Sequence, residues 1–300
     1  MTYQNPFAAE GRFYRGNTHT HTILSDGVLS PADRCRAYRE AGYDFLVITD
    51  HDVICDVSDL SQDDFLVIPG VELHPPNPYG GDTYHIVALG VRQPIDSRNM
   101  HPNEVIAAVQ AQGGLACLGH PYWCGHTLTD YALLKGYFAI EVFNDTCRRG
   151  IGKGVSESHW DDMLDRLGPT AGIACDDAHK ADADVFGGWT MVKAPQLSER
   201  AILQALRDGA FYSTQGPQFH DIRVEHPNAG EPVLDVRCSP VRSVIFKGRA
   251  SSGEHCIGQN GQLLSQARHV CKPAEKYVRV ELEDPDGRKA WANPFFVAEL

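Results

Sequence analysis

The sequence predicts an α/β fold of parallel strands joined by crossover helices, followed by a small antiparallel β domain. Over residues 1–217, short apolar runs alternate with amphipathic helical patterns, as in βαβ units. After residue 217, apolar and polar residues alternate strictly, as in YVRVELE at 277–283. A chain of 300 residues is long enough for both units. We therefore expect two domains, residues 1–217 and 218–300.

The strands of the first domain are expected at seven short apolar runs. These are residues 13–18, 44–49, 65–71, 115–119, 138–143, 171–175 and 189–193. An additional strand, TYHIVALGV at 83–91, is expected to lie in a hairpin.

Helices are expected between these strands. Ser30 followed by Pro31 predicts a helix start, and Gly42 predicts its end. Ser198 and Gly209 bound a second amphipathic helix in the same way. Similar patterns occur at 103–112 and 157–167.

Composition and charge narrow the class of protein. The net charge of −12 argues against a nucleic-acid surface, so an anionic substrate would have to be attracted by local charge. No segment has the roughly 20 apolar residues that cross a bilayer, and the N-terminal stretch lacks a signal-peptide pattern. The nine cysteines form no C-x-x-C pair. We expect a cytoplasmic protein without membrane contact, its cysteines serving as small core residues; the sequence gives no oligomeric state.

Residues that bind metals recur where the predicted strands end. His19 and His21 are two apart, so they share one face of the first strand. Further candidates at equivalent places are His51, Glu72, His85, His120, Asp177 and His179. In a parallel barrel the carboxyl ends of the strands meet at one rim. A lone histidine at a strand end is usually structural, but six of fourteen at such ends favour a metal centre.

Six separated motifs resemble the polymerase and histidinol phosphatase (PHP) superfamily of metal-dependent phosphoesterases. They are NTHTHT with SDG, TDHD, GVE, YHIVALG, GHP and DDAH, and the resemblance covers residues 13–217. GWTMVKAPQLSERAILQALRDGAFYSTQGP and RKAWANPFFV are similar to the branch named after carbaryl hydrolase, which has a C-terminal β domain. The resemblance implies a distorted (β/α)7 barrel, here followed by a β-sandwich-like domain, and two or three divalent ions of manganese, zinc or iron.

The resemblance also implies how the ligands are shared. His19, His21, Glu72 and Asp177 would hold one ion; Glu72 would bridge to a second held by His85 and His120; Asp26, His51 and His179 would hold a third. Asp177 is preferred to Asp176 because it is in phase with His179, and Asp176 and Asp50 would then orient ligands. Such an imidazole-rich set suits zinc, iron or manganese better than calcium or magnesium.

The expected reaction is hydrolysis by a hydroxide that bridges two ions. Asp177 is the candidate for taking or passing the proton, and Glu72 and His179 are the other expected catalytic residues. Three ions against three carboxylates leave positive charge that suits an anionic phosphomonoester or phosphodiester. Two ions leave almost none and suit a carboxylic ester, carbamate or amide. A third alternative is a non-catalytic metal-binding or sensory module.

The residues that contact the substrate are less clear from the sequence. GHPYWCGHT has Tyr122 and Trp123 where some related phosphatases have an arginine. These rings would wall an apolar leaving group or simply pack at the rim. Arg148 and Arg149, in CRRGIGKG, would bind the anion of a small-molecule substrate, or lie in a solvated basic loop.

Overall fold

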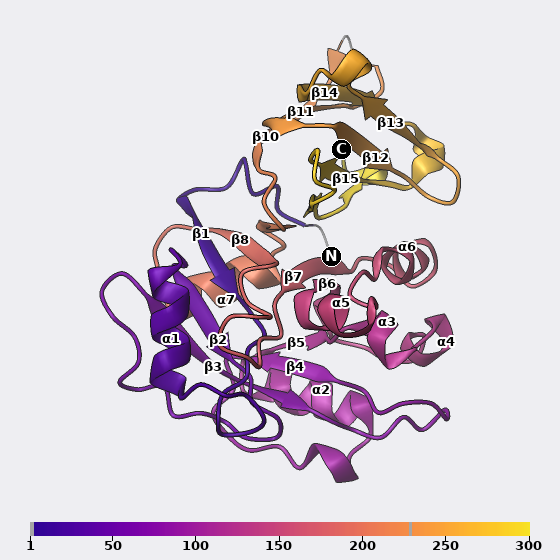
Figure 1. The fold of residues 1–300 in the computed structure, drawn as a ribbon. Coiled ribbons are helices and arrows are strands. Elements are labelled where there is room, and N and C mark those ends of the chain that lie inside the picture. The colour runs from indigo at the N-terminus through magenta and orange to yellow at the C-terminus, as the bar shows by residue number, and fades with distance from the viewer. Residues whose placement is uncertain (1–2, 228–229) are drawn as a thin grey trace.

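The barrel occupies the first two thirds of the chain and a β domain the last third (Figure 1). The structure is a computed structural model that describes residues 3–227 and 230–300. The barrel strands are β1 (Arg12–Asn17), β2 (Phe45–Ile48), β3 (Leu66–Leu73), β4 (Ile86–Leu89), β5 (Leu115–Leu118), β6 (Ala139–Asn144), β7 (Ala171–Cys175) and β8 (Trp189–Ala194). They lie in the order β8-β1-β2-β3-β4-β5-β6-β7, and the predicted α/β barrel followed by a β domain is confirmed.

Two strands run against the other six. β1, β2 and β3 are parallel to one another, as are β5, β6 and β7. β4 lies antiparallel between β3 and β5, in agreement with the hairpin expected for 83–91. The expectation of a parallel strand at 189–193 is wrong, because β8 pairs antiparallel with β1. The segment between β7 and β8 has no crossover helix that could bring the chain back in the parallel direction.

Side-chain hydroxyls join β7 to the other edge of the barrel. Thr190 Oγ1 donates to the carbonyl of Ala174, and Ser213 Oγ donates to the carbonyl of Gly172. Beyond the strand ends, the His21 amide donates to the carbonyl of Ala178 and the Asp177 amide to that of His19. The closure therefore places the segment after β1 beside the segment after β7.

Four long helices cover the barrel as predicted: α1 (Pro31–Glu40), α2 (Pro102–Ala111), α6 (Glu157–Arg166) and α7 (Glu199–Arg207). Ser30 caps α1 by accepting the Asp33 amide, and Ser198 caps α7 by accepting that of Ala201. Three short helices were not predicted: α3 (Pro121–Cys124), α4 (Leu128–Tyr131) and α5 (Asp145–Ile151). No helix in the described part of the chain is long and apolar enough to cross a membrane. All nine cysteines are free, and eight are buried.

The C-terminal strands form two antiparallel layers. β9 (Phe211–Thr214) pairs with β8 and extends the barrel sheet through β16 (Lys289–Ala292), β15 (Tyr277–Glu283), β12 (Ser243–Lys247) and β13 (Gly253–Ile257). A second sheet holds β10 (Phe219–Glu225), β11 (Val233–Val241) and β14 (Leu264–Val270), and β17 (Phe295–Phe296) pairs with β15. Short 3-10 helices lie at Ser97–Asn99, Gln259–Gly261, Pro273–Glu275 and Val297–Glu299. β16 pairs with β9, and Trp291 stacks on Phe143, so contacts cross the expected domain boundary. The boundary after residue 217 therefore stays a prediction.

Both faces of β15 are buried. Its apolar residues pack in the core of the β domain, whereas Arg279 and Glu281 face α6 and are fully buried. Arg279 pairs with Glu281, donates to Asp161 at 2.8 Å and lies over the ring of Trp160. An ion-pair network therefore joins the β domain to the barrel.

Glu157, at the start of α6, completes this network. Lys289 Nζ lies 2.6 Å and Lys247 Nζ 3.0 Å from its carboxylate, which also accepts the indole N–H of Trp291. Burial opposes ionisation of Glu157, but the two lysines outweigh it and lower its pKa to about 2. The carboxylate is therefore charged at neutral pH.

Replacing the buried cation tests the network. Arg279→Met is expected to lower the free energy of unfolding by about 3–5 kcal/mol, because Glu281 stays buried without its nearest cation. Arg268→Met, which removes the exposed pair with Glu225, is the control and is expected to cost under about 1 kcal/mol. Urea unfolding followed by circular dichroism measures both. Equal small losses would contradict a structural role for the buried pair.

Candidate metal centre

The candidate ligands meet at the rim formed by the carboxyl ends of the parallel strands. β1, β2, β3, β5 and β7 carry them at or just beyond these ends. His85 instead precedes β4, and because β4 runs antiparallel, its start lies at the same rim. His85 therefore lies at the same rim although it precedes its strand. In total, this rim gathers candidate ligands from six strands.

The first group consists of His19, His21, Glu72 and Asp177, all buried. His21 Nε2 lies 3.0 Å and His19 Nε2 3.3 Å from Asp177 Oδ1. The same nitrogens lie 3.4 and 3.3 Å from Glu72 Oε2. Neither Glu72 Oε2 nor Asp177 Oδ1 accepts a hydrogen bond that satisfies it, although both are buried. Two carboxylate oxygens and two ring nitrogens thus converge on one point.

The hydrogen bond of His19 to Glu141 determines which of its ring nitrogens faces the first group. Its Nδ1 lies 2.7 Å from the Glu141 carboxylate, so Nδ1 carries the proton in the neutral ring. Its Nε2 lone pair then faces His21 Nε2, only 3.1 Å away, and the carboxylates. Lone pairs and negative oxygens repel one another unless a proton or a metal cation lies between them. Burial lowers the pKa of His19, but the carboxylates of Asp177, Glu141 and Glu72 outweigh it and raise that pKa well above its usual value. The group therefore has the donor set and polarity of a divalent-metal site.

Glu72 also belongs to a second group, with His85 and His120. Its Oε1 lies 2.6 Å from His85 Nδ1 and 3.3 Å from His120 Nε2, while its Oε2 faces the first group. One carboxylate therefore presents an oxygen to each of two neighbouring sites.

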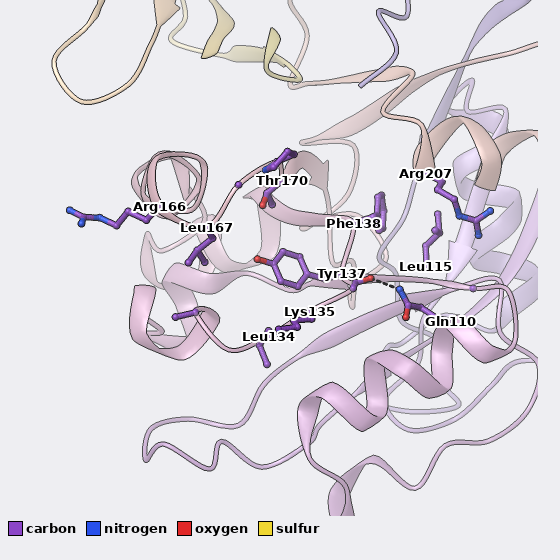
Figure 2. Close-up of a pocket in the computed structure, with 15 residues that line it drawn as sticks. Gln110, Leu115, Leu134, Lys135, Tyr137, Phe138, Arg166, Leu167, Thr170 and Arg207 are labelled. Carbon is purple, nitrogen blue, oxygen red and sulfur yellow. Dashed lines mark hydrogen bonds between the residues drawn. The ribbon is translucent and has the colours of Figure 1, made fainter. Parts of the chain in front are cut away.

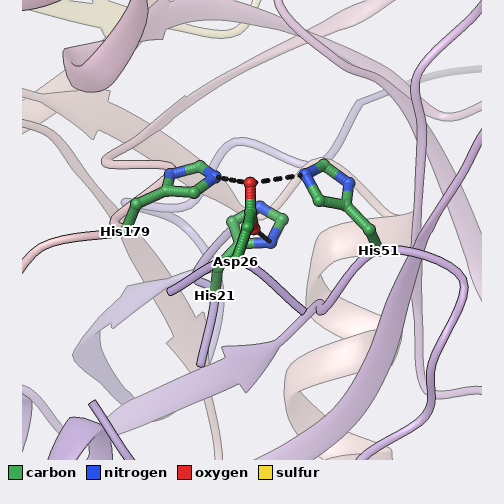
Figure 3. Close-up of side chains that lie close together, drawn as sticks. All are labelled: His21, Asp26, His51 and His179. Carbon is green, nitrogen blue, oxygen red and sulfur yellow. Dashed lines mark ion pairs between the residues drawn. The ribbon is translucent and has the colours of Figure 1, made fainter. Parts of the chain in front are cut away.

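The third group is more open. His51 and His179 point at Asp26 from opposite sides, with His21 beside them (Figure 3). Each Nε2 lies 3.4 Å from Asp26 Oδ2, and His21 Nδ1 lies 3.6 Å from Oδ1. About half of the Asp26 side chain is exposed. This group could hold a third cation, but with more freedom than the buried ones.

The electrostatic environment keeps the central carboxylates ionised. Burial opposes ionisation of Glu72, but the rings of His19, His120 and His51 outweigh it and hold its pKa well below the usual value. Asp177 shows the same balance, its pKa being lowered by His19 and His21 against the effect of burial. For His21, burial dominates and lowers the pKa, which favours the neutral ring that binds metals.

Backbone strain occurs at two positions of the cluster. His120 has φ +26° and Asp177 has φ +56°, in a region that residues other than glycine rarely adopt. Each lies two residues beyond the end of a strand, at the rim. Such strain persists only where the surrounding structure imposes it, and it is typical of functional sites.

Glu141 and Asn144 are cluster residues that the motifs do not include. Glu141, buried in β6, accepts from His19 Nδ1 through one oxygen and from the His120 amide through the other. Asn144 Nδ2 donates to Glu141 and to Asp177 Oδ2. One signal was available in the sequence, because a glutamate within the apolar run FAIEVF is rarely buried without a partner.

Asp176 and Asp50 lie behind the cluster. Asp176 accepts from Asn17, Tyr38 and the amides of residues 186–188, and burial raises its pKa to about 7 against the effect of these donors. Asp50 accepts from Thr22 and Ser25, and so holds the segment that leads to Asp26. Neither carboxylate belongs to the three groups. His74 lies closer to them, with its Nε2 3.1 Å from His51 Nδ1.

A cavity of about 360 Å³ opens over the groups. Trp123 lines it, with its ring edge-on to His120 and His85, and Lys180 is its one lysine or arginine among the described lining residues. Tyr122 lies outside it, near His159.

Arg148 and Arg149 do not reach this cavity either. Both pair with the buried carboxylate of Asp145 and line a separate hollow beside the β domain. Thr146, Cys147 and Gly150 of the same helix α5 are the residues that line the cavity over the three groups.

Comparison with solved structures supports the fold. A two-domain protein from Bacteroides vulgatus ATCC 8482, containing a predicted PHP-like metal-dependent phosphoesterase, matches with TM-score 0.54 at 17% identity, over 99% of this chain and 98% of that chain. A proposed metal-dependent phosphoesterase from Bifidobacterium adolescentis ATCC 15703 has TM-score 0.43 at 13% identity, over 56% and 89%. An amidohydrolase from Chromobacterium violaceum, with bound sulfate and no metal, has TM-score 0.43 at 17% identity, over 57% and 89%.

No protein-family model and no curated protein sequence matches the chain. The first structural likeness shows that the fold is shared over nearly the whole of both chains.

The orienting role of Glu141 can be tested by a change that keeps its shape. Glu141→Gln is expected to weaken Zn²⁺ affinity about 10–100-fold, because the amide has no negative charge and only one acceptor oxygen for the two donors, His19 Nδ1 and the His120 amide. Competition with a chromophoric chelator measures this affinity. Glu275→Gln is the matched control, since Glu275 is buried and bound to His269 in the β domain. Equal affinities for the two variants would show that Glu141 does not orient a ligand.

Proposed function

We propose that this protein is a metal-dependent hydrolase of the PHP superfamily, of the carbaryl-hydrolase-like branch, that cleaves phosphomonoesters or phosphodiesters. The observation that carries the proposal is the convergence of His19 and His21 lone pairs with the unsatisfied oxygens of Glu72 and Asp177. A divalent cation would relieve that arrangement, and Glu72 also presents an oxygen to the adjacent group. The superfamily and branch rest on the six motifs and the C-terminal segments of the sequence.

The donor set fits two or three divalent ions of manganese, zinc or iron. His19, His21, Glu72 and Asp177 would hold one; the others would be held by the groups around His85 with His120 and around Asp26. Imidazole nitrogens outnumber carboxylates, which disfavours calcium and magnesium. Ions bound in such sites supply a nucleophile from water at neutral pH and polarise the substrate oxygen.

The chain's own residues would orient the reaction and move protons. Asn144 fixes Asp177 through Oδ2 at 3.1 Å, leaving Oδ1 as a buried oxygen without a satisfying donor. Asp177 would contact the cation through Oδ1, and it is the candidate for taking or passing a proton released at the cluster. His179 donates from Nδ1 to the Asp177 carbonyl, so its Nε2 is the basic atom and faces the open side. Glu72 presents one oxygen to the first group and the other to the group of His85 and His120, and so would fix their relative position.

The substrate class follows from charge at the mouth of the cavity. Lys180 adds a cation there, and the open Asp26 group would add a third ion, which together favour an anionic small-molecule ester. Trp123 offers an apolar wall to the leaving group. The nine free cysteines suit a cytoplasmic, reducing setting.

A second candidate is hydrolysis of a carboxylic ester, carbamate or amide on the same centre. It is favoured by the absence of arginine from the described residues of the cavity, since arginine is the usual bidentate partner of phosphate. Two ions without the Asp26 site would leave a nearly neutral pocket. A catalytically inactive metal-binding module is the remaining alternative.

A paired assay decides among these functions. The manganese- and zinc-loaded proteins are expected to hydrolyse p-nitrophenyl phosphate faster than naphthyl acetate or a naphthyl carbamate. His19→Ala is expected to abolish turnover while leaving the far-ultraviolet circular dichroism unchanged. Ester or carbamate turnover without phosphate release would replace the proposal by the second candidate, and no turnover by a metal-loaded protein would favour the inactive module.

Lys180 provides a separate test of the anionic substrate. Lys180→Gln is expected to raise KM for p-nitrophenyl phosphate about tenfold, because a charge-assisted contact is lost, and to change kcat little. Lys153→Gln is the matched control, since Lys153 lies over the ring of Tyr122 outside the cavity. Steady-state kinetics measure both constants. An unchanged KM would remove Lys180 from the substrate site.

A further inference from the structure

A second, larger cavity lies at the opposite end of the barrel. Its volume is about 680 Å³, within the range of small-molecule sites. It is lined by residues that precede β5, β6 and β7, by the end of α6 and by α7 (Figure 2). The length of a strand, roughly 15 Å, separates it from the histidine cluster. In barrels of this kind, that end normally serves stability rather than chemistry.

The charge of this cavity is opposite to that of the protein. Lys135, Arg166 and Arg207 line it, and none of its 15 described lining residues is Asp or Glu, although the chain has a net charge of −12. Within residues 3–227 and 230–300, Lys135 and Arg207 form no ion pair, and Arg166 has only Asp162 at 3.9 Å, with both side chains mostly exposed. An exposed pair at that distance neutralises little charge. The cavity therefore holds cations that the fold leaves almost uncompensated.

Arg207 is held in place by neutral groups. Its Nη2 donates to the carbonyl of Gly113 at 3.0 Å and its Nη1 to Gln204 Oε1 at 3.3 Å. Both contacts orient the guanidinium without neutralising it, so its charge remains available. An oriented arginine with no carboxylate partner is a typical element of phosphate recognition.

The floor of the cavity is apolar. Leu115, Leu134 and Phe138 are buried below it, and the ring of Tyr137 lies in its middle (Figure 2). Gly136, with φ +88°, lets the loop approach the end of α2, where Gln110 Nε2 donates to the Gly136 carbonyl. An added Cβ there would lie 2.8 Å from the same amide nitrogen. The loop is thus fixed, and the cavity combines an apolar floor with cations at its margin.

We propose that this cavity is a second ligand site, for a small organic phosphate whose apolar part lies on the floor beside Tyr137 and whose phosphate contacts Arg207 and Lys135. Arg166, at the opposite margin in Figure 2, adds long-range attraction. The site is independent of the metal centre and of the reaction that takes place there.

Binding to metal-depleted protein tests this site separately from the metal centre. Phenyl phosphate, measured by isothermal titration calorimetry after metal removal, is expected to bind with one-to-one stoichiometry, equally well to wild type and to His19→Ala. Phenol is expected not to bind. The double variant Lys135→Gln/Arg207→Gln is expected to bind phenyl phosphate about tenfold more weakly, since charge-assisted contacts are lost. Absence of binding by wild type would overturn the proposal.

Two further variants control the interpretation. Arg200→Gln removes an exposed cation of the same helix α7 outside the cavity, and is expected to leave the affinity unchanged. Arg166→Gln, at the exposed end of α6, leaves the fold intact and is expected to weaken binding about threefold by loss of attraction. Unchanged binding in both cavity variants would overturn the site, as would loss of binding in His19→Ala, which would assign the ligand to the histidine cluster.

Discussion

The carboxylate of Glu72 is the constraint around which the rim is organised. It is buried at the end of β3, and its two oxygens face different histidine groups. A buried carboxylate without enough donors is costly, and so is the protonation of several buried histidines that would compensate it in the absence of metal ions. Divalent cations resolve both problems together. We therefore expect this rim to be most stable with metal ions bound.

Several features besides the ligand atoms themselves serve this arrangement. Hydrogen bonds between the segments after β1 and β7 hold His19 and His21 beside Asp177. Glu141 and Asn144 fix the tautomer of His19 and one oxygen of Asp177. Positive φ at His120 and Asp177 stores strain at the rim. The β domain contributes differently, since its buried Arg279 attaches it to α6 on the outside of the barrel.

Much of this could be predicted from the sequence, for identifiable reasons. Strands β2 to β7 are buried on both faces and therefore appear as largely apolar runs, while Ser30 and Ser198 mark the starts of α1 and α7. The candidate ligands occur at strand ends, so predicting the strands is enough to place these residues at one rim. The direction of β8 could not be predicted, because it depends on an irregular loop after β7.

Helix α5 explains why Arg148 and Arg149 lie elsewhere than expected. CRRGIGKG has the composition of a solvated basic loop, but its first residues continue a helix that begins at Asp145 and is capped by Asn144. Successive residues of a helix are rotated by about 100°, so Thr146 and Cys147 face the metal cavity while the two arginines turn to Asp145. Side-chain direction on so short a helix depends on its cap, which apolar periodicity does not reveal.

The most direct test of this account is an anomalous-scattering crystal structure of the protein loaded with Mn²⁺. The account predicts one peak among His19, His21, Glu72 and Asp177, and a second among Glu72, His85 and His120, with Glu72 contacting both. A peak near Asp26 would add the third ion. Absence of anomalous signal at this rim, or ions bound only elsewhere on the protein, would contradict the central claim.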